Sequence, residues 1–235
     1  MGEFSAEEKE AMKAEAGIAA CAFVKDRMTI GIGTGSTVKY TILEIGRRIR
    51  EEGLKVAGIP TSEATEKLSI EQGIPLLDWS DCVALDLVID GADEFDPEPH
   101  LIKGGGGALL REKIVAEASA GMVVVADASK RVDVLGDFPL PIEVNLYGWE
   151  QTCRRIEELC PGPVVRRGPD YLTDNGNPIL DAHFGPVISD PVGMEARLRE
   201  IAGVVEVGLF TNTADVVVLA APSGCQVIRK ETARL

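Results

Sequence analysis

The sequence predicts an α/β protein: a Rossmann-like three-layer domain with a mostly parallel sheet, plus an inserted small ferredoxin-like α+β domain. Two observations support this prediction. As far as Asp127, helical segments alternate with apolar runs that lack polar alternation, which is typical of strands buried on both faces. Beyond that point the order becomes strand, helix, strand, strand, helix, strand, as in ferredoxin-like domains.

The elements of the first domain follow from hydrophobic periodicity. Helices are expected where apolar residues recur every three or four positions, and strands where apolar residues run continuously. Serine or threonine starts and glycine stops mark several helix ends. The predicted helices are 5–25, 36–53, 61–73 and 108–120, and the predicted strands are 28–33, 54–60, 74–77, 85–94 and 121–127.

The second domain begins where the sequence becomes rich in proline. An extended segment, a helix and two strands around an Asn175-Gly176 hairpin signal are followed by a helix and a strand at 204–210. The closing apolar runs, 214–222 and 225–230, are expected to return to the first sheet. We therefore assign 1–129 and 207–235 to the Rossmann-like catalytic domain, and 130–206 to the inserted domain.

Composition excludes several classes of protein. The 235 residues carry a net charge of −14, which disfavours a nucleic-acid partner, so any anion site must be built locally. No apolar run reaches the roughly 18 residues of a membrane span, and the N-terminus lacks a signal-peptide pattern, so a cytoplasmic protein is expected. Five scattered cysteines and two histidines predict neither a disulfide framework nor a zinc site.

The segment "GIGTGST", 31–37, joins a predicted strand to a predicted helix. Its glycines let the backbone close on a ligand, and the helix N-terminus offers N–H groups and a positive dipole end. The hydroxyls of Thr34, Ser36 and Thr37 add donors, which suits a phosphate group. The last glycine and the ribose-binding acid of a dinucleotide site are missing, as is the Walker A lysine. A tight turn with a helix cap is the alternative.

The segment "DGADE", 90–94, follows a buried strand at its carboxyl end, where ligands of open α/β sheets bind. Two or three carboxylates crowded there resist ionising together, so one pKa can rise toward neutrality, which suits proton transfer to sugar oxygens. Turn formation is an equal alternative for these residues, and a Mg²⁺ site is a weaker third.

Four consecutive glycines, 104–107, precede a predicted helix, although each costs about 1 kcal/mol relative to alanine. Bare backbone suits a ligand that comes close, and its N–H groups can stabilise an oxyanion. Lys103 adds a positive charge, and Glu112 in the first two turns of the helix can act as a base. Alternatively, Glu112 only complements the helix dipole. Taken alone, Lys13 and Lys130 are more simply surface lysines, and Asp181 and His183 are expected to be structural.

Together these segments resemble type A ribose-5-phosphate isomerases. The motifs occur in the family's order and cover nearly the whole chain: "GIGTGST", "DGADE", "KGGGGALLREK", "ADASK", "FPLPIEV" and "TDNGN". The resemblance implies interconversion of D-ribose 5-phosphate and D-ribulose 5-phosphate through an enediolate, in the non-oxidative pentose phosphate pathway. It further implies no cofactor, no metal and a homodimer or homotetramer.

The resemblance also implies a role for each matching residue. Glu112 matches the proton acceptor that works between C1 and C2. Asp90 and Asp93 match acids that handle protons at sugar oxygens, and Lys103 opens the catalytic loop. The positions that match substrate-binding residues are Thr34, Gly35, Ser36, Thr37, Gly104, Gly105, Gly106, Lys130 and Lys13.

Two other functions fit a related scaffold. A non-catalytic sugar-phosphate sensor would bind without turnover, but the acids and Glu112 are all present and no basic patch is visible. A CoA transferase or a sugar-phosphate deaminase would act on a different substrate. Incubation with ribose 5-phosphate discriminates among all three.

Overall fold

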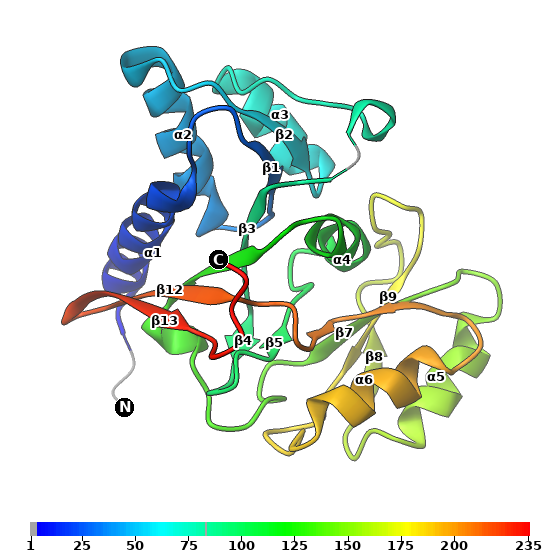
Figure 1. Ribbon diagram of the computed structural model, residues 1–235. Helices are drawn as coiled ribbons and strands as arrows, with labels where there is room; N and C mark the ends of the chain where they lie inside the picture. The colour runs from blue at the N-terminus through cyan, green and yellow to red at the C-terminus, as the bar shows by residue number, and fades with distance from the viewer. Residues whose placement is uncertain (1–3, 83) are drawn as a thin grey trace. The chain divides into compact units, whose positions relative to one another are not determined.

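The computed structural model describes residues 4–82 and 84–235, which form two compact units (Figure 1). Unit 1 comprises Met1–Gly91, Arg111–Lys130 and Thr213–Leu235. Unit 2 comprises Ala92–Leu110 and Arg131–Asn212. Unit 1 contains one sheet and unit 2 contains two, and each unit has its own core.

Unit 1 contains a six-stranded sheet among its described residues. In spatial order the strands are β13 (Gly224–Arg229), β12 (Val216–Ala221), β6 (Met122–Asp127), β3 (Leu87–Gly91), β1 (Thr29–Ile32) and β2 (Ala57–Pro60). The pairing of β12 with β13 is antiparallel, and every other pairing in the sheet is parallel. The strand order reverses at β1, which has β2 on one side and β3 on the other. In doubly wound sheets the crevice at this reversal binds ligands.

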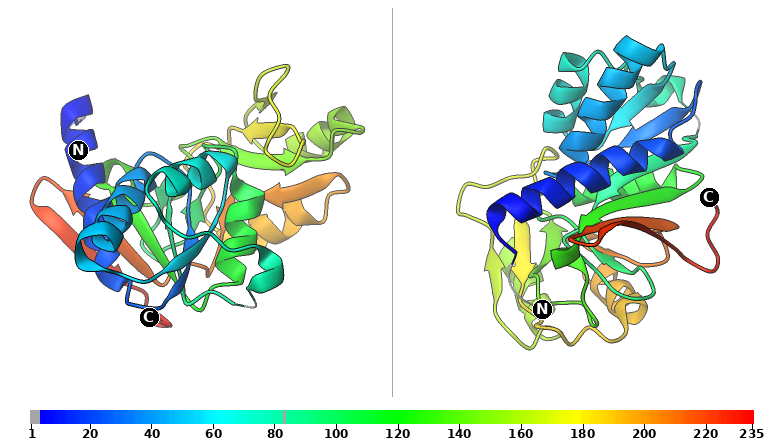
Figure 2. Two further views of the ribbon diagram at one scale, coloured as in Figure 1. Left: turned by 90° about the horizontal axis from the view of Figure 1, so that it is seen from above. Right: turned by 90° about the vertical axis from the view of Figure 1, so that its left-hand side faces the viewer.

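Helices cover both faces of this sheet. They are α1 (Ala6–Ala20), α2 (Val38–Glu52), α3 (Glu63–Glu71) and α4 (Leu109–Glu117), with the short 3-10 helices η1 (Cys21–Phe23), η2 (Trp79–Asp81) and η3 (Ala128–Lys130). Helix α1 packs against α2, β6 and β12 (Figure 2). On β1, Ile30 shares a core with Met12 of α1 and Ile42 of α2, whereas the next residue, Gly31, faces Val115 of α4. Successive strand residues point to opposite faces, so the predicted three-layer domain is confirmed.

Local chemistry explains most element ends, with two departures from expectation. Ser5, a predicted helix start, forms a capping box with Glu8 at the start of α1, and Gly53 ends α2 in the left-handed region at φ +71°. The first helix stops at Ala20, short of its predicted end, because the chain tightens into η1 before a turn in which Arg27 has positive φ. The strand predicted at 74–77 is reduced to one isolated bridge between Gly58 and Leu76.

Unit 2 contains a four-stranded antiparallel sheet. In spatial order the strands are β10 (Val204–Val207), β7 (Leu140–Val144), β9 (Ile179–Ala182) and β8 (Val164–Arg166), and the helices are α5 (Trp149–Glu157) and α6 (Pro191–Arg199). Ile142 of β7, Ile156 of α5 and Leu198 of α6 belong to one buried core, so both helices cover one face of the sheet. The spatial order is that of the predicted ferredoxin-like domain, which is thereby confirmed.

A third sheet was not predicted. Its strands are β11 (Leu209–Phe210), β5 (Leu101–Ile102) and β4 (Glu94–Phe95), all in unit 2. The strand predicted at 204–210 is interrupted at Gly208. The N–H of Gly208 donates to the carbonyl oxygen of Pro141, and its carbonyl oxygen accepts from the N–H of Lys103 at 2.8 Å. A Cβ on Gly208 would lie 2.4 Å from the Lys103 carbonyl oxygen, so the close approach requires glycine.

The compact units differ from the domains predicted from sequence mainly in the assignment of one segment, residues 92–110. Residues 92–110 group with unit 2 because β4 and β5 pair with β11, whereas the predicted boundaries place them in the first domain. The boundaries at 130 and 206 stay a prediction. Among the described residues, no helix is long and apolar enough to cross a membrane.

Candidate active site

The loop that follows β1 presents unused backbone donors at the start of a helix. Gly35 has φ +128°, and both Gly35 and Ser36 are exposed. Thr37 caps α2 without a side-chain capping bond. No hydrogen bond within the described part of the chain uses the backbone N–H of Gly35, Ser36 or Thr37. Such donors, at the positive end of a 15-residue helix, suit an anion.

A cluster of hydroxyl groups holds this loop against the end of β2. The Thr34 hydroxyl oxygen lies 2.7 Å from that of Thr61 and 2.8 Å from that of Ser62. The Thr65 hydroxyl oxygen lies 3.2 Å from that of Thr34, and the Thr65 hydroxyl donates to the carbonyl oxygen of Gly33 at 2.8 Å. Sequence reasoning missed Thr61, Ser62 and Thr65, because a Thr-Ser pair before a helix looks like a cap alone. One feature of the sequence could have identified them: they follow the predicted strand 54–60, and the carboxyl ends of neighbouring parallel strands lie at the same edge of a sheet.

Asp90 is joined to the same loop. Its Oδ1 accepts hydrogen bonds from the N–H groups of Thr34 at 3.0 Å and Gly91 at 2.7 Å. The residue is 0% exposed, and a Cβ on Gly33 would lie 2.2 Å from Oδ1. Gly33 is therefore required for the carboxylate to reach the loop. The structure thus brings together two of the predicted site segments, the loop 34–37 and the acid next to the last residue of β3.

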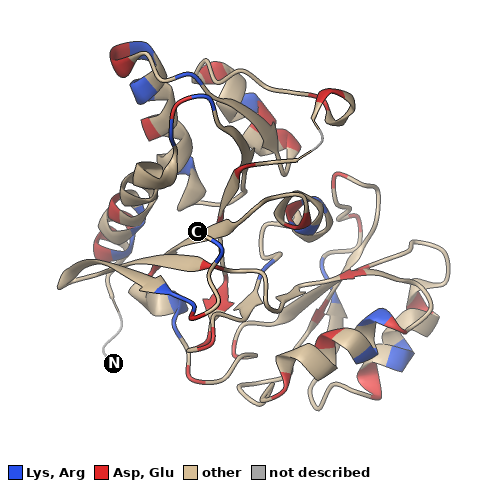
Figure 3. Cartoon of the chain, viewed as in Figure 1, with Lys and Arg blue, Asp and Glu red and all other residues tan. Residues whose placement is uncertain are grey.

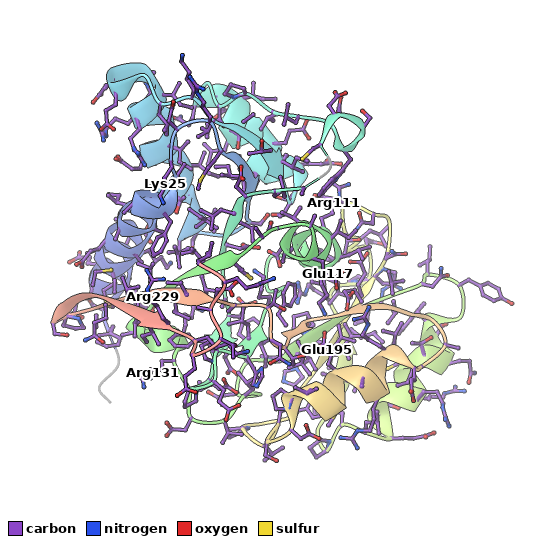
Figure 4. All side chains as sticks on the ribbon, viewed as in Figure 1. Lys25, Arg111, Glu117, Arg131, Glu195 and Arg229 are labelled. Atoms are coloured by element: carbon purple, nitrogen blue, oxygen red, sulfur yellow. The ribbon has the colours of Figure 1, made fainter. Side chains whose placement is uncertain are left out.

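Glu112 lies in the first turn of α4 and is buried. One turn later on the same helix, Val115 packs on Gly31 of β1, which fixes α4 against the sheet. A Cβ on Gly31 would lie 2.4 Å from this valine, so the small residue allows the close approach. Glu117 at the other end of α4 is exposed (labelled in Figure 4). The two glutamates of one helix therefore have different environments.

The two predicted lysines of unit 1 occupy different places. Lys13 Nζ lies 3.5 Å from a carboxylate oxygen of Glu10, on the face of α1 that also carries Gly17 one turn later. A Cβ on Gly17 would lie 2.7 Å from the Thr37 carbonyl oxygen, so this face borders the loop 34–37. Lys130 ends η3, which follows β6, and therefore belongs to the same carboxyl edge of the sheet as Asp90.

The glycine run lies in unit 2, together with Asp93 and Lys103. The N–H of Gly105 donates to Asp93 Oδ2 at 2.7 Å, and Gly104 has φ +99°. A Cβ on Gly105 would lie 2.6 Å from Asp93 Oδ1. Gly106 is exposed, whereas Lys103 is buried with its ammonium 5.4 Å from the centre of the Phe210 ring. The structure thus joins Asp93 to the predicted loop.

The third acid of "DGADE", Glu94, has a different surrounding. Its carboxylate accepts hydrogen bonds from the N–H groups of Gly136, at 2.8 Å, and of Phe138. Burial raises its pKa, and these two hydrogen bonds oppose the shift without reversing it. Glu94 therefore anchors the loop before β7 and is separate from the candidate site.

Outside these segments, helix α2 carries a network of ion pairs. Figure 3 shows basic and acidic residues interspersed along α2, where Arg47 bonds to Glu44, Glu51 and Glu52. Within residues 4–82 and 84–235, no group of three or more His, Cys, Asp and Glu side chains is arranged to hold a metal ion. The five cysteines are free.

The fold and the candidate site define a doubly wound α/β protein, with a loop of backbone N–H donors and a buried acid at the reversal point of its sheet. Residues 57–224 match the family model described as ribose 5-phosphate isomerase A (phosphoriboisomerase A). The chain is 50% identical over 233 residues to ribose-5-phosphate isomerase A of Methylorubrum extorquens, covering 95% of this chain and 98% of the relative. The chain belongs to the ribose 5-phosphate isomerase A family and is an enzyme of the isomerase class.

Solved structures agree with this assignment. The ribose 5-phosphate isomerase A of Methanocaldococcus jannaschii is 40% identical, with a TM-score of 0.89 over 94% of this chain and 100% of that one. A D-ribose-5-phosphate isomerase in complex with phospho-erythronic acid is 38% identical, also with a TM-score of 0.89, over 94% of this chain and 98% of that one. The similarity therefore extends across both units.

Proposed function

We propose that this protein interconverts D-ribose 5-phosphate and D-ribulose 5-phosphate through an enediolate, with Glu112 as the base. The observation that carries the proposal is the hydrogen bond from the Thr34 N–H, in the loop 34–37, to Asp90, in a chain that belongs to this isomerase family. That contact puts a carboxylate beside the place where a phosphorylated ligand would be anchored.

The chemistry requires one proton to move between two neighbouring carbons. Glu112 removes the proton from C2 of the open-chain aldose, and the electron pair forms the C1–C2 double bond of the enediolate, whose negative charge lies on O1. Glu112 then returns its proton to C1, and transfer of the O2 proton to O1 gives the ketose. Asp90, Asp93 and Lys103 handle the protons and the negative charge at the sugar oxygens.

The phosphate is proposed to bind where the backbone donors gather. The N–H groups of Gly35, Ser36 and Thr37 and the nearby hydroxyls offer neutral donors, and Lys13 and Lys130 add charge. Binding of this remote group holds the reacting carbons against the base, which is how a small enzyme uses substrate binding to accelerate proton transfer. Gly104, Gly105 and Gly106 offer backbone contacts to the sugar.

Further proposals concern the setting of the enzyme. We expect it to work in the cytoplasm in the non-oxidative pentose phosphate pathway, as a homodimer or homotetramer, without nucleic-acid or membrane partners and without a metal or redox cofactor. By analogy with its solved relative, we expect it to bind phospho-erythronic acid. This ligand carries a phosphate and a carboxylate, whose two charged oxygens imitate the enediolate.

The test is incubation of the protein with ribose 5-phosphate while ribulose 5-phosphate is measured, with and without EDTA. The proposal predicts rapid, EDTA-insensitive formation of the ketose. Binding without turnover would instead favour a sugar-phosphate sensor. Inactivity with ribose 5-phosphate together with CoA transfer or deamination of another sugar phosphate would favour the alternative enzymes.

A further inference from the structure

Arg167 lies beside the glycine run and hydrogen-bonds to its backbone. It follows β8 directly, and its Nη1 donates to the carbonyl oxygens of Gly104 at 3.0 Å and Gly105 at 3.1 Å. The carbonyl of Gly104 also accepts from the N–H of Gly107 at 2.9 Å, which closes the run into a turn. The same guanidinium therefore holds two successive peptide groups of the loop.

Asp181 fixes the guanidinium from the other side. Its two carboxylate oxygens accept from Arg167 Nε at 2.9 Å and Nη2 at 2.5 Å, a bidentate pair in which each side chain is only 20% exposed. Burial lowers the pKa of Arg167, but the bonds to Asp181 outweigh it and raise the pKa above the ordinary arginine value. The guanidinium therefore stays charged while it faces the loop.

Because the peptide bond is planar, these contacts to the carbonyl oxygens also determine the directions of the N–H groups in the same peptides. In a trans peptide, the C=O and the N–H of the following residue point in opposite directions. The peptide between Gly104 and Gly105 is hydrogen-bonded on both sides. Its carbonyl oxygen accepts from Arg167, and its N–H donates to Asp93 Oδ2 at 2.7 Å. In the next peptide the Gly105 carbonyl oxygen accepts from Arg167. The N–H of Gly106, which is exposed, therefore points away from Arg167.

Tyr171 supports the far end of the same run. Its hydroxyl oxygen would lie 1.8 Å from a Cβ on Gly107, so the phenol occupies the space where a side chain would stand. The Tyr171 ring centre lies 5.7 Å from the guanidinium carbon of Arg167. The segment 167–171 thus contacts the glycine run at both ends. Glycines have the widest conformational freedom of any residue, so their peptide directions must be set from outside the run.

We propose that Arg167, oriented by Asp181, is a positioning residue that fixes the direction of the Gly106 amide as a donor to the enediolate oxygen. This inference rests on the proposed isomerase function. Arg167 itself acts through the loop. Its loss should therefore affect the transition state, where the oxyanion develops, more than the binding of the phosphate.

The test compares Arg167→Gln with wild type and with Arg155→Gln. Arg155 is an exposed arginine of unit 2, paired with Glu158, and serves as the matched control. We expect Arg167→Gln to lower kcat about 10- to 100-fold, because a misdirected oxyanion donor costs on this order. We expect KM for ribose 5-phosphate to stay within about threefold, and Arg155→Gln to match wild type.

Two further measurements separate positioning from general damage. The affinity for phospho-erythronic acid should fall in parallel with kcat, whereas inhibition by inorganic phosphate should stay unchanged. Arg167→Lys should recover part of kcat, because it keeps the charge but not the bidentate fork. If Arg167→Gln does not fold, Asp181→Asn provides the test through the same set of measurements, with a smaller loss of kcat expected.

The possible outcomes are distinct. Wild-type kcat in folded Arg167→Gln, or a rise in KM alone, would overturn the positioning role while leaving the isomerase function intact. An inactive wild-type protein would overturn the isomerase function. In that event, unchanged binding of phospho-erythronic acid by Arg167→Gln would overturn the positioning role as well, and weakened binding would support it.

Discussion

Asp90 Oδ1 accepts a hydrogen bond from the backbone N–H of Thr34 at 3.0 Å, so the acid next to the last residue of β3 is bonded to the loop that follows β1. These two strands are neighbours in the sheet, and their carboxyl ends meet at the point where the strand order reverses. A substitution at Asp90 can therefore disturb proton handling, loop position or both.

Two substitutions at Asp90 should separate these effects. Asp90→Asn keeps an oxygen that can accept from Thr34 and Gly91, but it removes the charge. We expect kcat to fall about 10²- to 10⁴-fold, as for loss of an acid–base group, with little change in KM. Asp90→Ala removes the acceptor as well, so KM should rise in addition. Steady-state kinetics check both, and equal KM values for the two variants would contradict the loop-positioning role.

Gly105→Ala tests the contact between the glycine run and Asp93. The added Cβ would lie 2.6 Å from Asp93 Oδ1, so the carboxylate must move. We expect kcat to fall about 10²-fold, because small displacements in an active site have effects of this size. Gly148→Ala is the matched control, since its φ of +69° makes alanine strained there but no atom lies within 4 Å of the Cβ.

The two substitutions should affect different properties: Gly105→Ala should lower kcat, and Gly148→Ala should lower stability. Gly148→Ala should cost about 1–3 kcal/mol of stability through backbone strain and leave kcat unchanged. Full activity in Gly105→Ala would return the glycine run to the interpretation of a loose loop. The comparison requires only kinetics and thermal melts of the two proteins.

Much of the fold could be predicted because its elements are long enough to show periodicity. The buried runs of β3 and β6 and the helix face of α2 each extend over several residues. The three-stranded sheet could not be predicted, because β4, β5 and β11 are two residues each and two residues have no period. The interruption at Gly208 depends on Lys103 and Pro141, which lie far away in sequence.

The C-terminal segment, which has no recognisable motif, is held by Asp215. Arg234 donates to its carboxylate through Nε at 3.0 Å and Nη2 at 2.7 Å. Arg229, labelled on β13 in Figure 4, donates to the carbonyl of Leu235 at 2.7 Å. Burial raises the pKa of Asp215, but the bonds from Arg234 and from the N–H of Met122 outweigh it, so the pKa lies below its ordinary value.

Arg234→Gln should therefore lower stability in a pH-dependent way. At pH 7 we expect a loss of about 1–3 kcal/mol, the range for hydrogen bonds to charged groups. The stabilisation is complete above the ordinary aspartate pKa of about 3.9 and is lost as the pH falls through the lowered pKa of Asp215. The Tm difference between variant and wild type should therefore shrink on acidification. A gap that widens below pH 4 would contradict this account.

Cys21 should be unreactive in the folded protein. Burial, assisted by the charge of Glu44, raises its pKa to about 12. At pH 8 only about one thiol in ten thousand is then ionised, and the thiolate is the reactive form. Iodoacetamide followed by mass spectrometry should find Cys21 unmodified in native protein and modified after denaturation. Alkylation of Cys21 in native protein would contradict the burial.

The placement of two candidate site segments could be predicted because each is continuous in sequence. The loop 34–37 and the acids at 90–94 each follow an apolar run, so their position at a sheet edge could be inferred. Thr61, Ser62 and Thr65 were missed because their contact with Thr34 depends on the pairing of β1 with β2. Arg167 was missed because nothing near it in sequence indicates that it faces the carbonyls of the glycine run.

The central claim is that Glu112 moves the proton between C1 and C2, and turnover of Glu112→Gln tests it most directly. Glutamine preserves the shape of the buried side chain but cannot act as a base. Glu117→Gln, on the exposed end of the same helix, is the matched control. We predict an unchanged circular dichroism spectrum for both variants, and a fall in kcat of about 10²- to 10⁴-fold for Glu112→Gln alone. Near-wild-type kcat in folded Glu112→Gln would contradict the assignment of the base.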